Sequence, residues 1–272
     1  MAQKIPFASY ALAVDELGEG GAPAVLLHST GMSSKQWKRL AARLAPRHRV
    51  LLPDLLGYGE SSAWPRDRPF HWHLDVLGVE ALLDSLDEPA HLIGHSYGGL
   101  VALATALHRP RAVRSLSLVE PVAYGVLHEE SDRGALRSLN DPPFDAAALP
   151  ETPGADDAWL RWFVDYWNGP GAWSALPERA RASFLATAAV CYGEVRTLLE
   201  DRTPAAVWST IRAPTRLVRG ERSPEGARRV AELLSRAIPG ATLHDIAGAG
   251  HMSPITHEAD VSALVEAHVA AS

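Results

Sequence analysis

Short runs of apolar residues alternate along the chain with longer segments of helical spacing. The runs are rich in Val, Leu and Ile and lack the polar alternation of a half-exposed strand, which is typical of central strands buried on both faces. They occupy residues 24–28, 49–53, 90–94, 115–120, 215–219 and 241–246. Between them, apolar residues follow a helical spacing at 37–44, 74–86, 100–108 and 227–237. Strands that alternate with helices predict an α/β fold with a mostly parallel central sheet and helices on both faces.

Two regions depart from this rhythm. Residues 6–16 come closer to a period of two, which predicts one antiparallel strand at the edge of the sheet. The alternation stops at 121–204, where prolines and glycines are frequent. The prolines of this stretch include Pro142, Pro143, Pro150, Pro153 and Pro177. We therefore expect a core formed by residues 1–120 and 205–272, and a helical cap inserted at 121–204.

Aromatic residues cluster within the predicted cap at nearly helical spacing. They are Trp159, Trp162, Phe163, Tyr166, Trp167 and Trp173. Together they predict an apolar roof over a substrate site. The candidates for direct substrate contact are Trp159, Trp162, Tyr166 and Trp167. The alternative interpretation is that the rings only attach the cap to the core.

The composition is that of one large globular unit. The chain has 272 residues, of which 47% are hydrophobic and 21% charged, enough for a core covered on two faces. Twenty-six Lys and Arg against 32 Asp and Glu give a net charge of −6, which would repel a nucleic-acid backbone. We therefore expect a single domain with one insertion, a small-molecule substrate and no nucleic-acid partner.

Cysteine usage and apolar run lengths narrow the class further. Cys191 is the only cysteine, which excludes an intramolecular disulfide and a cysteine-based metal site. No stretch approaches the roughly 20 apolar residues of a membrane span. Near the N-terminus, Pro6, Asp15 and Glu16 interrupt the apolar positions, so no secretory leader is expected. The sequence therefore predicts a cytoplasmic protein.

The segment from Gly94 to Gly99 contains the pattern G-x-S-x-G with Ser96 at its centre. It follows an apolar run and precedes a helical segment, so Ser96 is expected on a sharp, strained strand-to-helix turn. Glycine at positions 94 and 98 lets the two backbones approach closely. The turn would present the Ser96 hydroxyl above the sheet, near the positive end of the helix dipole. The segment thus predicts a serine nucleophile.

Four motifs, in this order, resemble those of the α/β-hydrolases of the esterase, lactonase and carbon–carbon-bond hydrolase type. They are the loop at 28–32 followed by Trp37, the P-D-x-x-G-x-G-x-S segment at 53–61, the Ser96 turn, and the late G-x-G-H at 248–251. The resemblance covers almost the whole chain outside the predicted cap and implies the α/β-hydrolase fold. One departure is Ser29, which stands where the family usually has glycine.

A serine hydroxyl is barely acidic at neutral pH and needs a base to accept its proton. Among the 12 histidines, the resemblance assigns this role to His251, with His257 as the nearest competitor. It places His28 and His95 beside the nucleophile, and His28 is also a candidate substrate contact. The resemblance further implies that the backbone amides of Thr30 and Tyr97 form the oxyanion hole.

The acid that completes the triad is where the sequence departs from the common plan. Many members of the family carry it shortly after the strand at 215–219, but Ser223 occupies that place. A serine cannot balance the charge of a histidinium. Some haloalkane dehalogenases of this fold carry the acid at the end of the preceding core strand, and Glu120 holds that position here. We therefore predict Glu120 as the triad acid, with Glu221 and Glu225 as alternatives on the usual loop.

These assignments predict a serine hydrolase that cleaves esters of a small to medium apolar substrate through an acyl-enzyme, without metal or organic cofactor. Lactone hydrolysis, carbon–carbon bond hydrolysis and a perhydrolase side activity would use the same residues. Epoxide hydrolases and dehalogenases use a carboxylate nucleophile, which Ser96 disfavours. A small-molecule receptor without catalytic activity is the alternative of a different class, because a fold does not guarantee turnover.

Overall fold

The computed structural model describes residues 2–64, 69–128, 134–135 and 157–272. Within these residues eight strands form one sheet, in the order β1-β2-β4-β3-β5-β6-β7-β8. Their bounds are β1 Gln3–Phe7, β2 Tyr10–Leu17, β3 Ala24–Leu27, β4 Val50–Pro53, β5 Ala90–His95, β6 Val113–Val119, β7 Thr215–Gly220 and β8 Thr242–Ile246. Strands β3 to β8 are parallel, which confirms the predicted sheet.

The N-terminal edge differs from the single antiparallel strand predicted over 6–16. Strands β1 and β2 form a hairpin whose last pair is Phe7 and Tyr10, and β2 pairs antiparallel with β4. Ala8 has a φ of 45°, the left-handed conformation that a two-residue hairpin turn requires. The prediction missed the turn because Ala8 and Ser9 are not the Asn or Gly that usually mark one.

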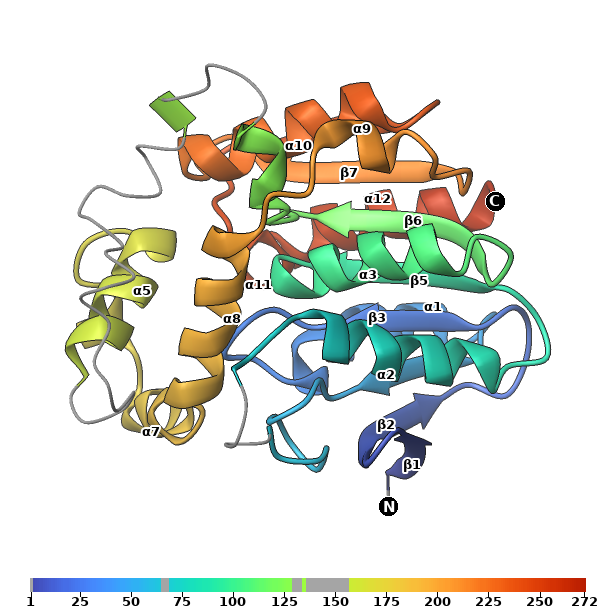
Figure 1. Ribbon diagram of the computed structural model, residues 1–272, viewed down its shortest axis with the longest axis horizontal. Coiled ribbons are helices and arrows are strands. Elements are labelled where there is room, and N and C mark those ends of the chain that lie inside the picture. The colour runs from blue at the N-terminus through green and yellow to red at the C-terminus, as the bar shows by residue number, and fades with distance from the viewer. Residues whose placement is uncertain (1, 65–68, 129–133, 136–156) are drawn as a thin grey trace.

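Helices cover both faces of the sheet (Figure 1). One face packs against α2 (His73–Asp84), α3 (Tyr97–His108), α9 (Ala205–Trp208) and α10 (Glu225–Ala237). The other packs against α1 (Lys38–Leu44) and α12 (Glu258–Ala270). The remaining described elements are η1 Ser34–Trp37, η2 Tyr124–His128, α5 Ala158–Asn168, α6 Ala172–Ala175, α7 Glu178–Ala186, α8 Ala188–Glu200 and α11 Ser253–Thr256.

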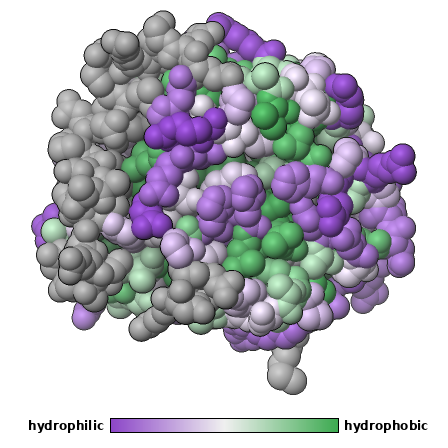
Figure 2. Space-filling model, in the orientation of Figure 1, coloured by the Kyte–Doolittle hydropathy of each residue, from purple (hydrophilic) through white to green (hydrophobic). Residues whose placement is uncertain are grey.

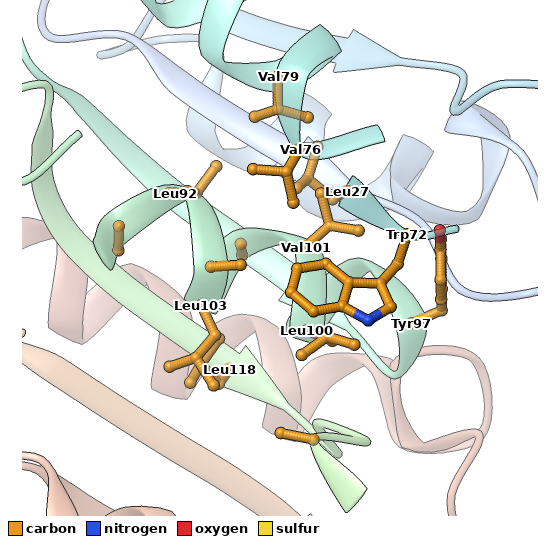
Figure 3. Close-up of a cluster of buried hydrophobic side chains, with 14 of the residues drawn as sticks. Leu27, Trp72, Val76, Val79, Leu92, Tyr97, Leu100, Val101, Leu103 and Leu118 are labelled. Carbon is orange, nitrogen blue, oxygen red and sulfur yellow. The ribbon is translucent and has the colours of Figure 1, made fainter. Parts of the chain in front are cut away.

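The central strands are buried on both faces, as their apolar runs predict, but the run at 241–246 forms the edge strand β8, in which only Ile246 is buried. Every residue of β3, β4 and β5 is buried. Figure 3 shows part of the larger core, where Val79 of α2 and Val101 of α3 lie with Leu92 of β5. On the opposite face, Leu26 packs in a second cluster with α1 and α12. Full burial of each such side chain contributes about 1.5–3 kcal/mol, so the parallel strands form a rigid platform.

The helices α5 to α8 follow β6 in the chain and lie beside the carboxyl ends of the parallel strands (Figure 1). We call residues 121–204 the insertion. Its first element, η2, packs against α10 of the core. The predicted prolines Pro142, Pro143, Pro150 and Pro153 lie outside the described residues. The division into a core and a cap at these boundaries therefore stays a prediction.

The surface of the described part of the chain is mixed in polarity. Figure 2 shows hydrophilic and hydrophobic residues interspersed on one face. In the same part of the chain, no helix is both long and apolar enough to cross a lipid bilayer. The large hydrophobic side chains that are exposed are Leu77, Leu185 and Ile255. Ile255 lies at a cavity beside Ser96, described below.

Candidate active site

Ser96 lies on a strained turn between β5 and α3. Its φ of 53° and ψ of −116° are unfavourable for a residue with a side chain, which agrees with the turn predicted from the motif. A Cβ on Gly94 would come within 2.3 Å of the Gly98 carbonyl oxygen. A Cβ on Gly98 would come within 2.4 Å of the His28 carbonyl oxygen. Both glycines are therefore required by the close approach of the strand, the helix and the neighbouring loop.

His251 lies next to Ser96, in the turn between β8 and α11. Its Nε2 is 2.9 Å from Ser96 Oγ, and both side chains are buried. His95 Nε2 donates to the backbone carbonyl of His251 at 2.9 Å, which holds this turn in place. The ring of Trp167 stacks on the His251 ring with a centroid distance of 3.8 Å. The imidazole is thus held between the core and a helix of the insertion.

Glu120 reaches the other nitrogen of the same imidazole. Its Oε2 is 3.2 Å from His251 Nδ1, and the residue is fully buried at the end of β6. Its Oε1 accepts hydrogen bonds from the Ser223 hydroxyl at 2.8 Å and from the Gly220 amide. Ser223, which stands where the family commonly has the acid, therefore orients the Glu120 carboxylate. The residue at the usual acid position, Ser223, and the acid at the end of β6, Glu120, are thus joined by a hydrogen bond.

The competing candidates lie elsewhere. Glu221 is exposed and accepts a hydrogen bond from the Gly248 amide at 2.9 Å. Glu225 is exposed at the start of α10. The Nδ1 of His257 is 2.9 Å from the Thr256 hydroxyl. The structure thus brings together Ser96, His251 and Glu120, and none of the alternatives.

Ser29 replaces the usual glycine of the loop after β3, and its side chain has defined partners. Both its hydroxyl and its amide donate to Gln36 Oε1, at 2.9 and 3.1 Å. Gln36 Nε2 donates to His95 Nδ1 at 3.0 Å. Since His95 in turn donates to the His251 carbonyl, a chain of hydrogen bonds joins the predicted oxyanion loop to the predicted base. Burial lowers the pKa of His95 well below its usual value, so His95 stays neutral in this chain.

Two cavities lie beside Ser96. Both are lined by Thr30, Phe163 and Trp167. The larger has a volume of about 320 Å³ and a predominantly apolar lining. That lining includes Phe163, Val164, Trp167, Leu176, Phe184 and Ile255. The smaller, of about 20 Å³, has room for roughly one water molecule. The site can therefore accept a molecule with one bulky apolar part and one small part.

The smaller cavity is mainly apolar, but a tyrosine is among the residues that line it. Tyr124 of η2 lines it together with Val122 and Leu198. The Tyr124 hydroxyl is buried and has no hydrogen-bond partner within the described part of the chain. A buried hydroxyl without a partner is unfavourable, so Tyr124 is a candidate donor to a bound molecule.

The predicted substrate contacts divide into two groups. Tyr166 and Trp167 line the cavities beside Ser96. Trp159 and Trp162 do not, because they pack within the helices of the insertion. His28 is also not at either cavity, since it is fully buried and its Nε2 accepts a hydrogen bond from the Leu55 amide at 3.0 Å. Neither cavity beside Ser96 is lined by these three residues, and their role as substrate contacts stays a prediction.

Sequence reasoning did not select several residues of the site. Phe184 lines the larger cavity and Tyr124 the smaller, and neither belongs to a motif. Glu194 is fully buried on α8, on the same helix face as Cys191 and Leu198. The sequence does contain a signal for Glu194, because a glutamate on an otherwise apolar helix face is unusual.

The described residues offer no cluster of three or more His, Cys, Asp or Glu side chains suited to a metal ion. The buried Cys191 thiol has a pKa raised by burial to about 12. A thiol with that pKa stays protonated and is a poor nucleophile. Among these residues, the nucleophile best placed for catalysis is therefore Ser96.

Comparison with known proteins identifies the relatives of this chain. The pimeloyl-[acyl-carrier protein] methyl ester esterase of Chromobacterium violaceum is 30% identical over 262 residues, which cover 94% of this chain and 97% of that protein. A shorter match, 45% identical over 112 residues, is to the dihydrolipoyllysine-residue acetyltransferase component of an acetoin cleaving system from Pseudomonas putida. It covers 40% of this chain and only 29% of that protein.

The same fold occurs among solved structures. A hydrolase from Pseudomonas aeruginosa superimposes with a TM-score of 0.76 at 25% identity, over 98% of both chains. The model of the alpha/beta hydrolase family matches residues 24–264, which include Ser96, Glu120 and His251. The chain therefore belongs to the alpha/beta hydrolase family.

Proposed function

We propose that the protein is a serine hydrolase that cleaves carboxylic esters through an acyl-enzyme. The proposal rests on one observation: the His251 imidazole contacts Ser96 and Glu120 at the same time. Ser96 Oγ lies 2.9 Å from Nε2, and Glu120 Oε2 lies 3.2 Å from Nδ1. In this arrangement the imidazole can accept the serine proton while the carboxylate balances the positive charge that forms.

The first half of the reaction forms the acyl-enzyme. Ser96 Oγ attacks the ester carbonyl carbon, and His251 Nε2 takes the hydroxyl proton. The carbonyl oxygen becomes an oxyanion, which accepts hydrogen bonds from the amides of Thr30 and Tyr97. The intermediate then collapses, the carbon–oxygen bond to the alcohol breaks, and His251 gives its proton to the departing alkoxide.

The second half releases the acid. A water molecule in place of the alcohol loses a proton to His251 and attacks the acyl carbon. A second oxyanion forms in the same hole, and Ser96 leaves with the proton from His251. Glu120 Oε2 accepts a hydrogen bond from the proton on Nδ1, so Nε2 is the nitrogen that accepts and returns the serine proton.

The two cavities support a substrate with one bulky apolar substituent and one small one. A volume of about 320 Å³ on one side suits an aryl or medium alkyl group, and about 20 Å³ on the other suits a group no larger than methyl. The name of the Chromobacterium violaceum relative, a methyl ester esterase, agrees with a small alcohol. The buried Tyr124 hydroxyl is available as a donor on the small side.

The test combines labelling of the nucleophile with a substrate panel. A fluorophosphonate should label the protein stoichiometrically, and Ser96→Ala should abolish labelling. The panel contains methyl and p-nitrophenyl esters of increasing acyl length, a lactone and a vinylogous diketone. We expect fastest turnover of esters with one small group. Preferential turnover of the lactone or the diketone would move the activity to that class. Ligand binding without labelling would instead indicate a receptor.

A further inference from the structure

Two fully buried carboxyl groups lie behind the predicted oxyanion hole. Asp75 belongs to α2 and Glu194 to α8, and neither lines the cavities beside Ser96. The mechanism above uses neither residue. Burial of a carboxyl group costs stability unless its hydrogen bonds are satisfied, so their partners indicate what each group does.

Glu194 is joined to the oxyanion loop through Tyr58. The Tyr58 hydroxyl donates to Glu194 Oε2 at 3.0 Å and accepts a hydrogen bond from the Gly31 amide, also at 3.0 Å. Gly31 directly follows Thr30, whose amide is a predicted oxyanion donor. The Thr30 hydroxyl also lies near the Glu194 carboxyl and favours its ionised form. Gly31 is thus linked to helix α8 through Tyr58, while Glu194 Oε1 has no hydrogen-bond partner among the described residues.

Asp75 is joined to the other predicted donor. The Tyr97 hydroxyl donates to Asp75 Oδ2 at 2.7 Å, and the Leu56 amide donates to Oδ1 at 2.9 Å. Leu56 lies two residues before Tyr58. Asp75 therefore connects the residue after the nucleophile to the segment that carries Tyr58.

The buried location of Glu194 affects its charge state. Burial, the largest effect, and the nearby Asp75 raise the pKa of Glu194 well above its usual value, against the Thr30 and Tyr58 hydroxyls. Burial therefore favours the neutral form of the Glu194 carboxyl. A neutral Glu194 carboxyl can still accept the Tyr58 hydrogen bond through Oε2.

We propose that Glu194 and Tyr58 are positioning residues of the oxyanion hole, which hold the Thr30 amide in place from helix α8 of the insertion. The inference rests on the proposed function, because it assumes that the Thr30 amide binds an oxyanion. It assigns to the insertion a part in transition-state stabilisation as well as in substrate binding. The alternative is that the same hydrogen bonds only attach α8 to the core.

Two readouts separate these roles. The first is the change in kcat against the change in KM for a good ester substrate. The second is the affinity for an alkyl trifluoromethyl ketone, whose adduct with a serine places an oxyanion in the hole. A positioning role affects kcat and ketone affinity together, because both depend on the oxyanion. A purely structural role lowers the melting temperature and leaves both unchanged.

Tyr58→Phe keeps the ring and removes only the hydroxyl that bridges Glu194 and Gly31. We expect kcat to fall about 10–100-fold, KM to change less than about threefold, and ketone affinity to fall with kcat. Glu194→Leu should behave in the same way. Glu194→Gln retains a carbonyl oxygen that accepts from Tyr58, so it should recover activity to within about threefold of wild type.

The matched control is Ser115→Ala. It removes another buried hydrogen bond, 2.7 Å to His91, at the amino ends of β5 and β6. We expect a loss of stability with unchanged kcat and ketone affinity. Tyr58→Phe and Glu194→Leu variants that behave like this control would overturn the positioning role. Wild-type protein that does not react with a fluorophosphonate would overturn the proposed function instead.

Discussion

The carboxyl edge of the sheet and the insertion that lies beside it are built in different ways. At the edge, Ser96 and Glu120 both have positive φ values, 53° and 52°, and are held by packed strands. The insertion contributes apolar side chains such as Phe163 and Phe184 to the larger cavity. Ser96 and Glu120 thus stand on packed strands, whereas much of the apolar wall of the larger cavity comes from helices without a motif.

The two regions meet at His251 and at the oxyanion loop. Trp167 of α5 stacks on the imidazole, and Glu194 of α8 reaches the loop through Tyr58. These contacts predict that the insertion affects the chemistry as well as the choice of substrate. The following experiments test how the two regions share these roles.

The largest effects are expected at the core. Ser96→Ala and His251→Ala should each lower ester turnover by about 10⁴–10⁶-fold in kcat, and the double variant should lose little more, because the two residues act as one unit. Steady-state kinetics of the purified variants measure this. A variant that keeps more than about a tenth of the activity would remove that residue from the catalytic set.

The next effect concerns the acid. Glu120→Gln removes the charge beside His251 Nδ1 and should lower kcat by about 10⁴-fold, with the fold retained by circular dichroism. Glu221→Gln and Glu225→Gln are matched controls on the loop where the family commonly carries the acid. We expect near wild-type rates for both. If either control lost most of its kcat while Glu120→Gln stayed active, the acid would be the glutamate changed in that control and not Glu120.

A smaller effect is expected at the insertion. Trp167→Ala removes the ring that covers His251 and lines both cavities, so KM for long-chain esters should rise about tenfold, with less effect on the shortest ester. Trp162→Ala is the matched control, because Trp162 stacks on Tyr166 but lines neither cavity. Equal losses across the ester series in both variants would indicate a structural role for the two tryptophans.

The last effect is on stability rather than on activity and comes from Asp75. Burial raises its pKa in the folded state to about 6, above the ordinary value of 3.8. The folded state therefore binds the Asp75 proton more tightly than the unfolded state does. As a result, the contribution of Asp75 to the free energy of unfolding falls as the pH rises from about 4 to about 7. Between pH 4 and pH 7, the free energy of unfolding of the wild type should fall by up to about 3 kcal/mol relative to that of Asp75→Asn.

Urea unfolding of both proteins at several pH values measures this difference. The Asn side chain does not titrate, so it supplies the reference for all other ionisable groups. A difference between the two proteins that stays constant, or rises with pH, would contradict a raised pKa of Asp75.

Much of the fold follows from the sequence because it rests on local patterns. Apolar runs without alternation are found as the buried strands β3 to β7, since such runs are stable only when covered on both faces. The Ser96 turn is partly local, because Gly94 is required by the backbone of Gly98, four residues away, whereas Gly98 is required by the His28 backbone on the neighbouring loop. The hairpin at Ala8 was missed because its turn residues are unusual ones.

The partners within the site are decided by the tertiary structure. Ser223 orients Glu120 across 103 positions of the chain, and Glu194 reaches Tyr58 across 136. No periodicity or spacing reports such contacts, since they depend on which strands are neighbours and on where the insertion lies. Local patterns were enough to predict the parallel strands and the serine turn, because both rest mainly on residues that are close in sequence. Only the folded chain decided which acid meets His251, which rings line the cavities and what supports the oxyanion loop, because distant side chains meet there in a dry interior where unpaired polar groups are costly.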